Sequence, residues 1–164
     1  MLDEWIKTYG RRLWGLCLKL CGSRSRAEEL YQDTWLRVLE KQDRYDPDQP
    51  FEPWLTRICV NLYRSRLRRW ALQPQAQFAT QEDLTAFLEG VPDTPQKSYQ
   101  DLYDAVNTLP EKLRLTVILY YFKDMDVPAT ANLLKVPAGT VKSRLGRARK
   151  QLREVLGDEA DHVF

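Results

Sequence analysis

The chain has 164 residues, of which 43% are hydrophobic and 29% charged, as in an ordinary water-soluble globular protein. This length accommodates one mid-sized domain or two small ones. The sequence contains no apolar run near the roughly 18 residues that a membrane span needs, and no secretory signal opens it, so we expect a cytoplasmic protein with no direct membrane contact.

Three cysteines and one histidine give little support for a metal site or a disulfide framework. The cysteines are an odd number, Cys17, Cys21 and Cys59, in a chain with no export signal. Cys17 and Cys21 lie four residues apart on a predicted helix, but His162 belongs to a polar tail. Because zinc usually takes four convergent ligands, we expect no metal and no other cofactor.

The net charge of +2 conceals two basic clusters. The range 57–69 holds five arginines and no acid, and the range 135–153 holds seven basic residues and no acid. Two such clusters suggest two contacts with polyanions such as nucleic acid. The alternative is two solvated helix faces with no partner.

Helical spacing of apolar residues predicts a first helix that ends at Gly22. Its apolar stripe comprises Leu2, Trp5, Ile6, Tyr9, Leu13, Leu16, Cys17 and Leu20. A second helix is expected to start with a capping box formed by Ser25 and Glu28 and to run to about Glu40. Its inward stripe would be Ala27, Leu30 or Tyr31, Thr34 or Trp35, and Val38.

A third helix follows a loop rich in Pro and Asp over residues 44–50, with Pro53 in its first turn and its end near Trp70. Two faces separate along it. One is apolar, with Leu55, Ile58, Cys59 and Leu62. The other recurs at intervals of three and four residues and carries Trp54, Arg57, Asn61, Arg64 and Arg68. A purely structural helix does not need this second stripe.

Residues 71–100 lose this periodicity and are rich in Gln and Pro, with one lysine against four acids. They predict an acidic, flexible linker between a domain at 1–70 and a domain at 101–164.

The second domain is expected to be helical as well. Thr108 and Glu111 suggest a capping box with Pro110 in the first turn, followed by a buried stripe of Leu113, Val117, Tyr120 and Tyr121. After a turn at 123–126, a short helix over 128–134, a connection at 135–137 and a long basic helix from Ala138 to about Leu156 predict a helix-turn-helix. The inward stripe of the long helix would be Val141, Leu145, Ala148, Leu152 and Val155. No strand-like alternation appears, so the fold class is all-α.

The second helix of a helix-turn-helix enters the major groove of DNA. Its outward residues here suit base edges and phosphates: Thr140, Lys142, Ser143, Arg144, Arg147, Arg149, Lys150 and Arg153. In the first domain, Trp54 and Tyr63 beside cations would suit unpaired bases, which stack on aromatic rings. The alternative for Trp54 is a plain core residue.

The outward side of the second helix carries Gln32, Asp33, Leu36 and Arg37. An exposed Leu36 next to charges favours a protein contact surface, and the alternative is an Asp33–Arg37 pair on a solvated face. No Gly-rich phosphate loop or convergent acid pair supports an enzyme. Two other functions remain open: a conventional dimeric helix-turn-helix regulator, and an adaptor whose basic faces bind acidic proteins.

The chain resembles the extracytoplasmic-function group of the sigma-70 family over nearly its whole length. Residues 27–38 (AEELYQDTWLRV) resemble region 2.2, residues 51–69 resemble regions 2.3 and 2.4, and LPEK at 109–112 with VPAGTVKSRLGRAR at 136–149 resembles region 4. The resemblance implies two helical domains, a region 2 bundle and a region 4 helix-turn-helix, in a transcription initiation factor that is not an enzyme.

The resemblance also implies partners and roles. Gln32, Asp33, Leu36 and Arg37 would bind the β′ clamp of core RNA polymerase, and region 4 would meet the β flap. Trp54, Arg57, Asn61, Arg64 and Arg68, with the loop before Trp54, would open and read the −10 element. Thr140, Lys142, Ser143, Arg144, Arg147, Arg149 and Lys150 would bind the −35 element. An anti-sigma factor is a further expected partner.

Three positions depart from the family pattern: Ser65 replaces an Asp, Lys135 a Gly and Thr130 an Ile. Lys135 is therefore expected to adopt a left-handed or strained backbone at a cost of about 1 kcal/mol.

Overall fold

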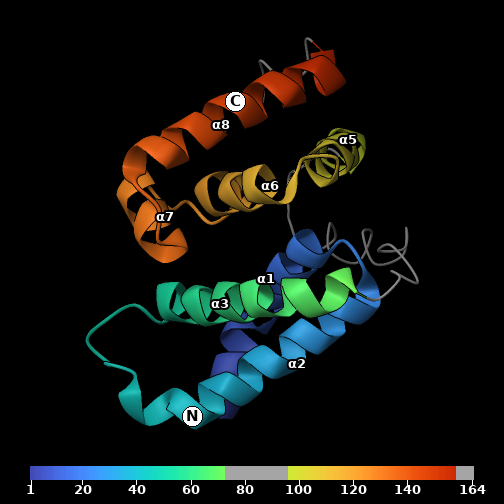
Figure 1. The fold of residues 1–164 in the computed structure, drawn as a ribbon. Helices are drawn as coiled ribbons and strands as arrows, with labels where there is room; N and C mark the ends of the chain where they lie inside the picture. Colours follow the sequence, from blue (N-terminus) through green and yellow to red (C-terminus); the bar gives the residue numbers. More distant parts are fainter. Residues whose placement is uncertain (73–95, 158–164) are drawn as a thin grey trace. The chain divides into compact units, whose positions relative to one another are not determined.

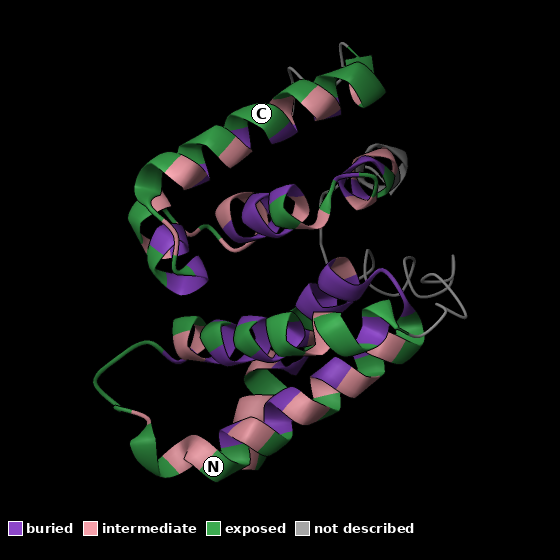
Figure 2. Cartoon of the chain, in the orientation of Figure 1, coloured by how far each residue is buried: buried purple, intermediate pink, exposed green. Residues whose placement is uncertain are grey.

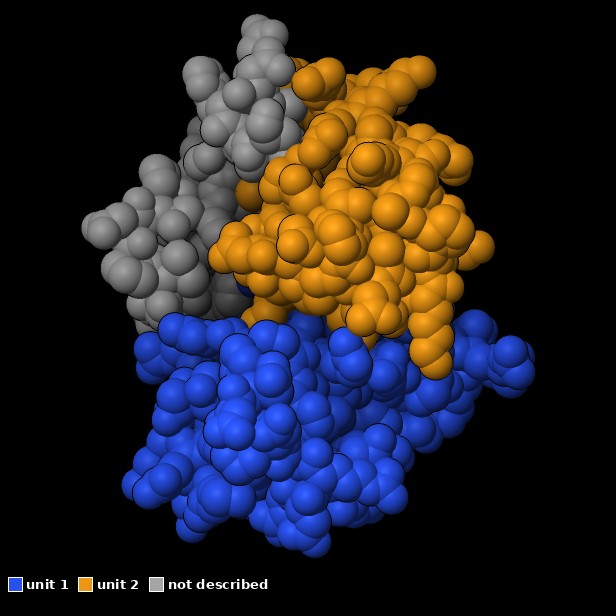
Figure 3. Space-filling model, turned by 90° about the vertical axis from the view of Figure 1, so that its left-hand side faces the viewer, with its two compact units in different colours: residues 1–90 blue, residues 91–164 orange. Residues whose placement is uncertain are grey.

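A computed structural model describes residues 1–72 and 96–157 of the chain. The chain divides into two compact units, Met1–Gly90 and Val91–Phe164, which are coloured separately in Figure 3. Every regular element in the described ranges is helical, so the predicted all-α fold class is confirmed. Most of the predicted linker, residues 73–95, lies outside the described residues.

The first unit is a bundle of three helices, α1 (Leu2–Cys21), α2 (Arg24–Lys41) and α3 (Phe51–Ala71), with a short 3-10 turn, η1 (Gln42–Arg44), after α2 (Figure 1). Each helix packs against the other two. The predicted apolar stripes supply the core: Leu20, Ala27, Leu30, Val38 and Cys59 are all fully buried. Each leucine buried in this way stabilises the unit by about 1.5 to 3 kcal/mol.

The junction between α1 and α2 differs from the predicted one. Gly22 ends α1 as expected, in the left-handed conformation (φ 66°), and its N–H donates to the Leu18 carbonyl at 2.9 Å. Ser23 then starts α2 at once, and its side chain accepts from the Arg26 N–H at 3.4 Å. The predicted Ser25–Glu28 capping box is wrong because Ser25 lies inside the helix and Glu28 instead pairs with Arg24 at 3.1 Å.

The three cysteines are free, buried thiols inside the first unit. The Sγ atoms of Cys17 and Cys59 approach to 3.9 Å across the contact between α1 and α3. Burial, and next the hydrogen bond with Cys59, raise the pKa of Cys17 well above its ordinary value. These residues therefore act as small apolar core members, and the described residues hold no cluster of three or more metal-ligand side chains.

The second unit contains α5 (Gln96–Asn107), α6 (Glu111–Val117), the π-helix η2 (Ile118–Phe122), α7 (Val127–Leu134) and α8 (Ala138–Leu156). Helix α8 packs against α5, α6 and α7 (Figure 1). The short helix, the turn and the long helix expected for a helix-turn-helix are present, and Asp126 caps α7 by accepting from the Ala129 N–H at 2.8 Å. Helix α5 begins at Gln96, five residues before the predicted domain boundary at 101.

The predicted cap between α5 and α6 is wrong. Thr108 donates its hydroxyl back to the Ala105 carbonyl at 2.6 Å, which finishes α5 instead of starting α6. Glu111 pairs with Arg114 at 2.5 Å, and the N-cap position of α6 is Pro110 with no side-chain cap. Because α5 ends and α6 begins within a few residues, Thr108 lies close enough to cap either the end of α5 or the start of α6.

The π-helix changes which residues after α6 are buried. Its wider turn, closed by the Lys123 N–H to the Ile118 carbonyl at 3.1 Å, breaks the spacing that the sequence pattern assumed. Ile118 and Leu119 are fully buried, whereas Tyr120 and Tyr121, predicted as core, are only half-buried. At the end of α8, Val155 was also predicted as core, but it is 58% exposed. The last turn of α8 is mostly exposed (Figure 2).

The turn between α7 and α8 has the left-handed backbone expected at Lys135. Its φ and ψ are 58° and 46°, and its N–H caps α7 by donating to the Ala131 carbonyl. The side chain is exposed, so no packing contact compensates for the conformation. Asp124 also has a positive φ, of 53°, but aspartate tolerates this region better than lysine.

Replacing Lys135 with glycine should stabilise the second unit by about 0.5 to 1 kcal/mol, because glycine adopts this conformation without a Cβ clash. The greater chain entropy that glycine loses on folding offsets part of this gain. Asp124→Gly is the matched control and should change stability less. Chemical unfolding followed by circular dichroism would measure both. A Lys135→Gly variant less stable than the parent would contradict the assignment of strain to this turn.

Candidate nucleic-acid interfaces

Helix α3 presents its predicted polar stripe to solvent. Arg57, Asn61, Arg64 and Arg68 are exposed, and Trp54 at the start of the stripe is half-buried. The opposite side of the helix, with Leu55, Ile58, Cys59 and Leu62, is buried in the bundle. The burial pattern therefore separates two faces as the sequence predicted, and the outer one is cationic.

Trp54 belongs to an aromatic cluster formed with Trp5, Tyr9, Tyr45 and Phe51. Trp5 stacks on Phe51 with ring centroids 4.5 Å apart, and Tyr45 lies 5.0 Å from Trp54. Trp54 is thus neither a fully buried core residue nor an isolated stacking platform. Its half-exposed ring is held in place by its neighbours.

Tyr63 does not extend this surface, contrary to expectation. It is 1% exposed and its ring lies 6.1 Å from that of Trp70, on the inner side of α3. Nine residues separate Tyr63 from Trp54, which places them on different sides of the helix. The sequence pattern did not reveal Trp5, which reaches this cluster from α1.

The loop before α3 is tied to the same aromatic cluster. Tyr45 donates its hydroxyl to the Gln49 carbonyl at 2.6 Å while its ring contacts Trp5, Phe51 and Trp54. Asp46 accepts from the Asp48 N–H at 3.0 Å through its side chain. These bonds give the loop a defined shape beside the start of the cationic stripe.

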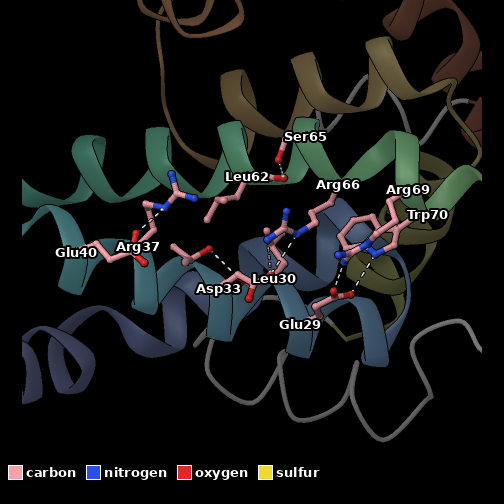
Figure 4. A network of polar contacts seen from close by, with 11 residues as sticks. Glu29, Leu30, Asp33, Arg37, Glu40, Leu62, Ser65, Arg66, Arg69 and Trp70 are labelled. Atoms are coloured by element: carbon pink, nitrogen blue, oxygen red, sulfur yellow. Dashed lines mark hydrogen bonds and ion pairs between the residues drawn. The ribbon is translucent and has the colours of Figure 1, made fainter.

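The remaining arginines of α3 face α2 and are paired with acids (Figure 4). Arg66 donates from Nε and Nη2 to Asp33 Oδ2 at 3.3 and 3.1 Å. Arg69 pairs with Glu29, whose second oxygen accepts from the Trp70 indole at 3.1 Å. The five arginines of α3 therefore fall into two sets, an inner pair that fixes α3 to α2 and an outer set of Arg57, Arg64 and Arg68.

These pairs change the interpretation of the predicted protein contact surface on α2. Gln32 is exposed and Leu36 is 58% exposed, next to Leu39 at 46%. Asp33 and Arg37, predicted as part of the same surface, already bind Arg66 and Glu40, the latter at 3.2 Å. The alternative of a direct Asp33–Arg37 pair is therefore wrong. What remains outward is an apolar patch of Leu36 and Leu39 bordered by polar groups.

Ser65, expected from the resemblance to depart from the family pattern, makes a local bond. Its hydroxyl donates to the Leu62 carbonyl in its own helix at 2.9 Å (Figure 4). The side chain is exposed.

Helix α8 exposes most of its predicted DNA-binding residues. Lys142, Ser143, Arg147 and Lys150 are exposed, and Thr140, Arg144 and Arg149 are half-buried at the edges of this face. Gly139 and Gly146 lie among them, and a Cβ added at either would meet no atom within 4 Å. Both glycines therefore lie in open space along the cationic helix.

One contact on α8 was not predicted. Arg149 donates from Nε to the hydroxyl of Tyr121 at 2.6 Å, and its guanidinium lies 5.7 Å from the centre of that ring. Residue spacing within α8 could not reveal this contact, because Tyr121 belongs to η2. The π-turn that places Tyr121 there leaves no obvious sequence signal.

Comparison with known proteins adds two kinds of match. The model of sigma-70 region 2 matches residues 5–72 and that of sigma-70 region 4 matches residues 99–152. The chain is 30% identical to the ECF RNA polymerase sigma factor SigW of Bacillus subtilis, over 93% of this chain and 87% of the relative. It is 32% identical to the ECF RNA polymerase sigma factor SigE of Mycolicibacterium smegmatis, over 98% of this chain and 63% of the relative.

The fold is also shared with a solved structure. The sigma factor RpoE, in its complex with the anti-sigma factor NepR from Bartonella quintana, superposes with a TM-score of 0.73 at 24% identity, over 95% of this chain and 96% of that one. In the parts of the chain that the structure describes, no helix is both long and apolar enough to cross a membrane.

The division of the α3 arginines predicts different effects of removing them. Arg66→Ala should destabilise the first unit by about 1 kcal/mol, because it leaves Asp33 half-buried without its cation. Arg57→Ala, on the exposed face of the same helix, should change stability by less than about 0.5 kcal/mol. All five tryptophans lie within residues 1–72, so tryptophan fluorescence during urea unfolding reports on this unit. Equal effects of the two substitutions would contradict the division.

Proposed function

Because this chain belongs to the extracytoplasmic-function group of the sigma-70 family, we propose that it directs core RNA polymerase to promoters through separate DNA contacts of its two units. The observation that carries this proposal is that regions 2 and 4 occur in order on one chain and that each unit exposes one cationic helix face. Sigma factors are transcription initiation factors rather than enzymes, and we propose no catalytic site or cofactor here.

The first unit would bind the −10 element as unpaired DNA. Arg57, Arg64 and Arg68 would hold phosphates, Asn61 would offer hydrogen bonds to bases, and the half-exposed Trp54 would stack on a base. The loop at 45–50, fixed to the aromatic cluster, would lie next to the same strand. Each stacked base would contribute about 1 to 3 kcal/mol.

The α2 surface would bind the β′ clamp of the polymerase. Its exposed centre is Leu36, with Gln32 beside it. Asp33 and Arg37 would serve the same surface less directly, since each already has an ion-pair partner in the unit. An apolar side chain that is removed from water only in the complex contributes to binding in proportion to its buried area.

The second unit would bind the −35 element as duplex. Lys142, Ser143 and Arg147 would reach base edges in the major groove, with Thr140 and Arg144 at the edges of this face and Arg149 and Lys150 as phosphate contacts. The same unit would meet the β flap. Short side chains and two glycines let α8 approach the groove closely.

We further propose that residues 1–70 and 101–164 are the two working domains and that 71–100 is an acidic linker between them. Docking on polymerase would fix their spacing, so that binding of one DNA element raises the effective concentration of the other domain at its own element. Solved structures that share this fold include the sigma factor RpoE bound to NepR, which is called an anti-sigma factor, and CnrH bound to the cytosolic domain of CnrY. An anti-sigma partner and a cytoplasmic location are therefore part of the proposal.

Run-off transcription with core RNA polymerase and a promoter library tests the proposal. Adding the protein should create transcripts with new start sites, because only a bound sigma factor directs the core enzyme to promoter elements. A dimeric regulator of the helix-turn-helix type would instead bind duplex tightly on its own, usually at a palindrome. Failure to associate with core enzyme or to change any start site would rule the proposed function out.

Two double variants should separate the two surfaces. Gln32→Ala with Leu36→Ala should weaken binding to core polymerase tenfold or more while promoter duplex binding persists, and it spares Asp33, whose loss would also break the Arg66 pair. Lys142→Ala with Arg147→Ala should do the reverse, since each strong base contact contributes about 1 to 3 kcal/mol. Co-purification with polymerase and electrophoretic mobility shifts measure these effects. Loss of polymerase binding in the second variant would refute the assignment of α8.

A further inference from the structure

Arg149 occupies a distinctive position on α8. It lies at the edge between the buried stripe, which includes Ala148 and Leu152, and the exposed cationic face. At 3.6 residues per turn, Lys142 and Arg153 fall on the same flank of the helix as Arg149. This flank is one of the two edges from which a helix in the major groove can reach the phosphates beside it.

Arg149 is held by a neutral group, unlike the inner arginines of α3. Arg66 and Arg69 are each bound by a carboxylate, which neutralises their charge. The partner of Arg149 is the phenol of Tyr121, which orients the guanidinium by the 2.6 Å hydrogen bond and by its ring without cancelling the charge.

The geometry of this bond leaves the two Nη groups of the Arg149 guanidinium available for an anion. The bond uses Nε, whereas the two Nη groups supply the paired donors that grip a phosphate through two oxygens. An arginine side chain that is already oriented loses less conformational freedom when it binds. Tyr121 thus orients Arg149 toward a phosphate without neutralising its charge.

The position of Tyr121 depends on the π-helix. The wide turn over Ile118–Phe122 keeps Ile118 and Leu119 in the core and leaves the rings of Tyr120 and Tyr121 half-exposed, 4.9 Å apart and nearly perpendicular. A single-turn π segment often marks a functional position in a helix. Here it brings the hydroxyl of Tyr121 to α8. The adjacent Tyr120 provides a control residue of the same chemistry.

We propose that Tyr121 is a positioning residue that orients Arg149 as a clamp for a phosphate of duplex DNA. This inference rests on the proposed function insofar as α8 is taken as the duplex-binding helix. It adds Tyr121, a residue outside the helix-turn-helix, to the residues that support DNA binding. The π-turn then serves to place the Tyr121 hydroxyl against Arg149.

Binding of the full-length protein to a labelled duplex of mixed sequence tests the inference, because phosphate contacts do not read bases. Affinity is measured between 50 and 200 mM salt for the parent and for Arg149→Ala, Tyr121→Phe, Tyr120→Phe and the Tyr121→Phe/Arg149→Ala double variant. One lost phosphate contact should reduce the salt slope by about 0.9, so that over this range the affinity of Arg149→Ala falls about threefold less than that of the parent.

Tyr121→Phe keeps the ring and removes only the hydroxyl. It should lower affinity and reduce the slope in the same direction as Arg149→Ala, and the double variant should bind no more weakly than Arg149→Ala alone. Tyr120→Phe should match the parent in both measurements. Melting temperatures of all variants, followed by circular dichroism, show whether the second unit remains folded.

Three results would overturn the inference: a parent-like slope in Tyr121→Phe, additive losses in the double variant, or an Arg149→Ala variant that melts earlier but binds DNA with an unchanged slope. The last result would make the contact a brace between η2 and α8 only. Failure of the proposed function has a different signature, because there the parent protein itself would produce no promoter-directed transcripts with core polymerase.

Discussion

The first unit depends on how α2 accommodates the positive charge of α3. Five arginines within residues 57–69 repel one another, and a helix with this charge can pack only if its neighbour supplies acids or if the cations stay in water. Helix α2 supplies Asp33 and Glu29 to Arg66 and Arg69. Two ion pairs thus fix the rotation of α3, so that the other arginines point outward as one cationic face.

The sequence was sufficient to predict the helices and their buried faces, because burial of an apolar stripe repeats every three or four residues and leaves a regular signal. Gly22 and the full span of α8 followed from the same reasoning. The capping boxes predicted at Ser25 and Thr108 were wrong. A Ser or Thr followed three residues later by Glu often occurs by chance, and where two helices adjoin, the same side chain can cap either one. The prediction that Tyr120 and Tyr121 are buried was wrong for another reason, because the π-turn departs from the regular helical period that the pattern assumes. At Val155 the apolar stripe continues into the last turn of α8, where the side chain is exposed.

The exposed cationic faces were predictable from the sequence, but the contacts between their side chains and other elements were not. Exposed cations on α3 and α8 could be read from helical spacing, whereas the partners of Asp33, Arg37 and Arg149 depend on contacts between elements far apart in the chain. The same holds for Trp5, which completes the aromatic cluster from another helix. These contacts orient side chains on the exposed faces of each unit.

The burial of the three cysteines affects how readily oxidants can react with the first unit. All three thiols are buried, and Cys17 is held in its protonated form, whereas peroxides and electrophiles attack the exposed thiolate. The folded first unit therefore offers oxidants no exposed thiol. A redox signal that acts through thiols would therefore have to be sensed by another molecule while this unit stays folded.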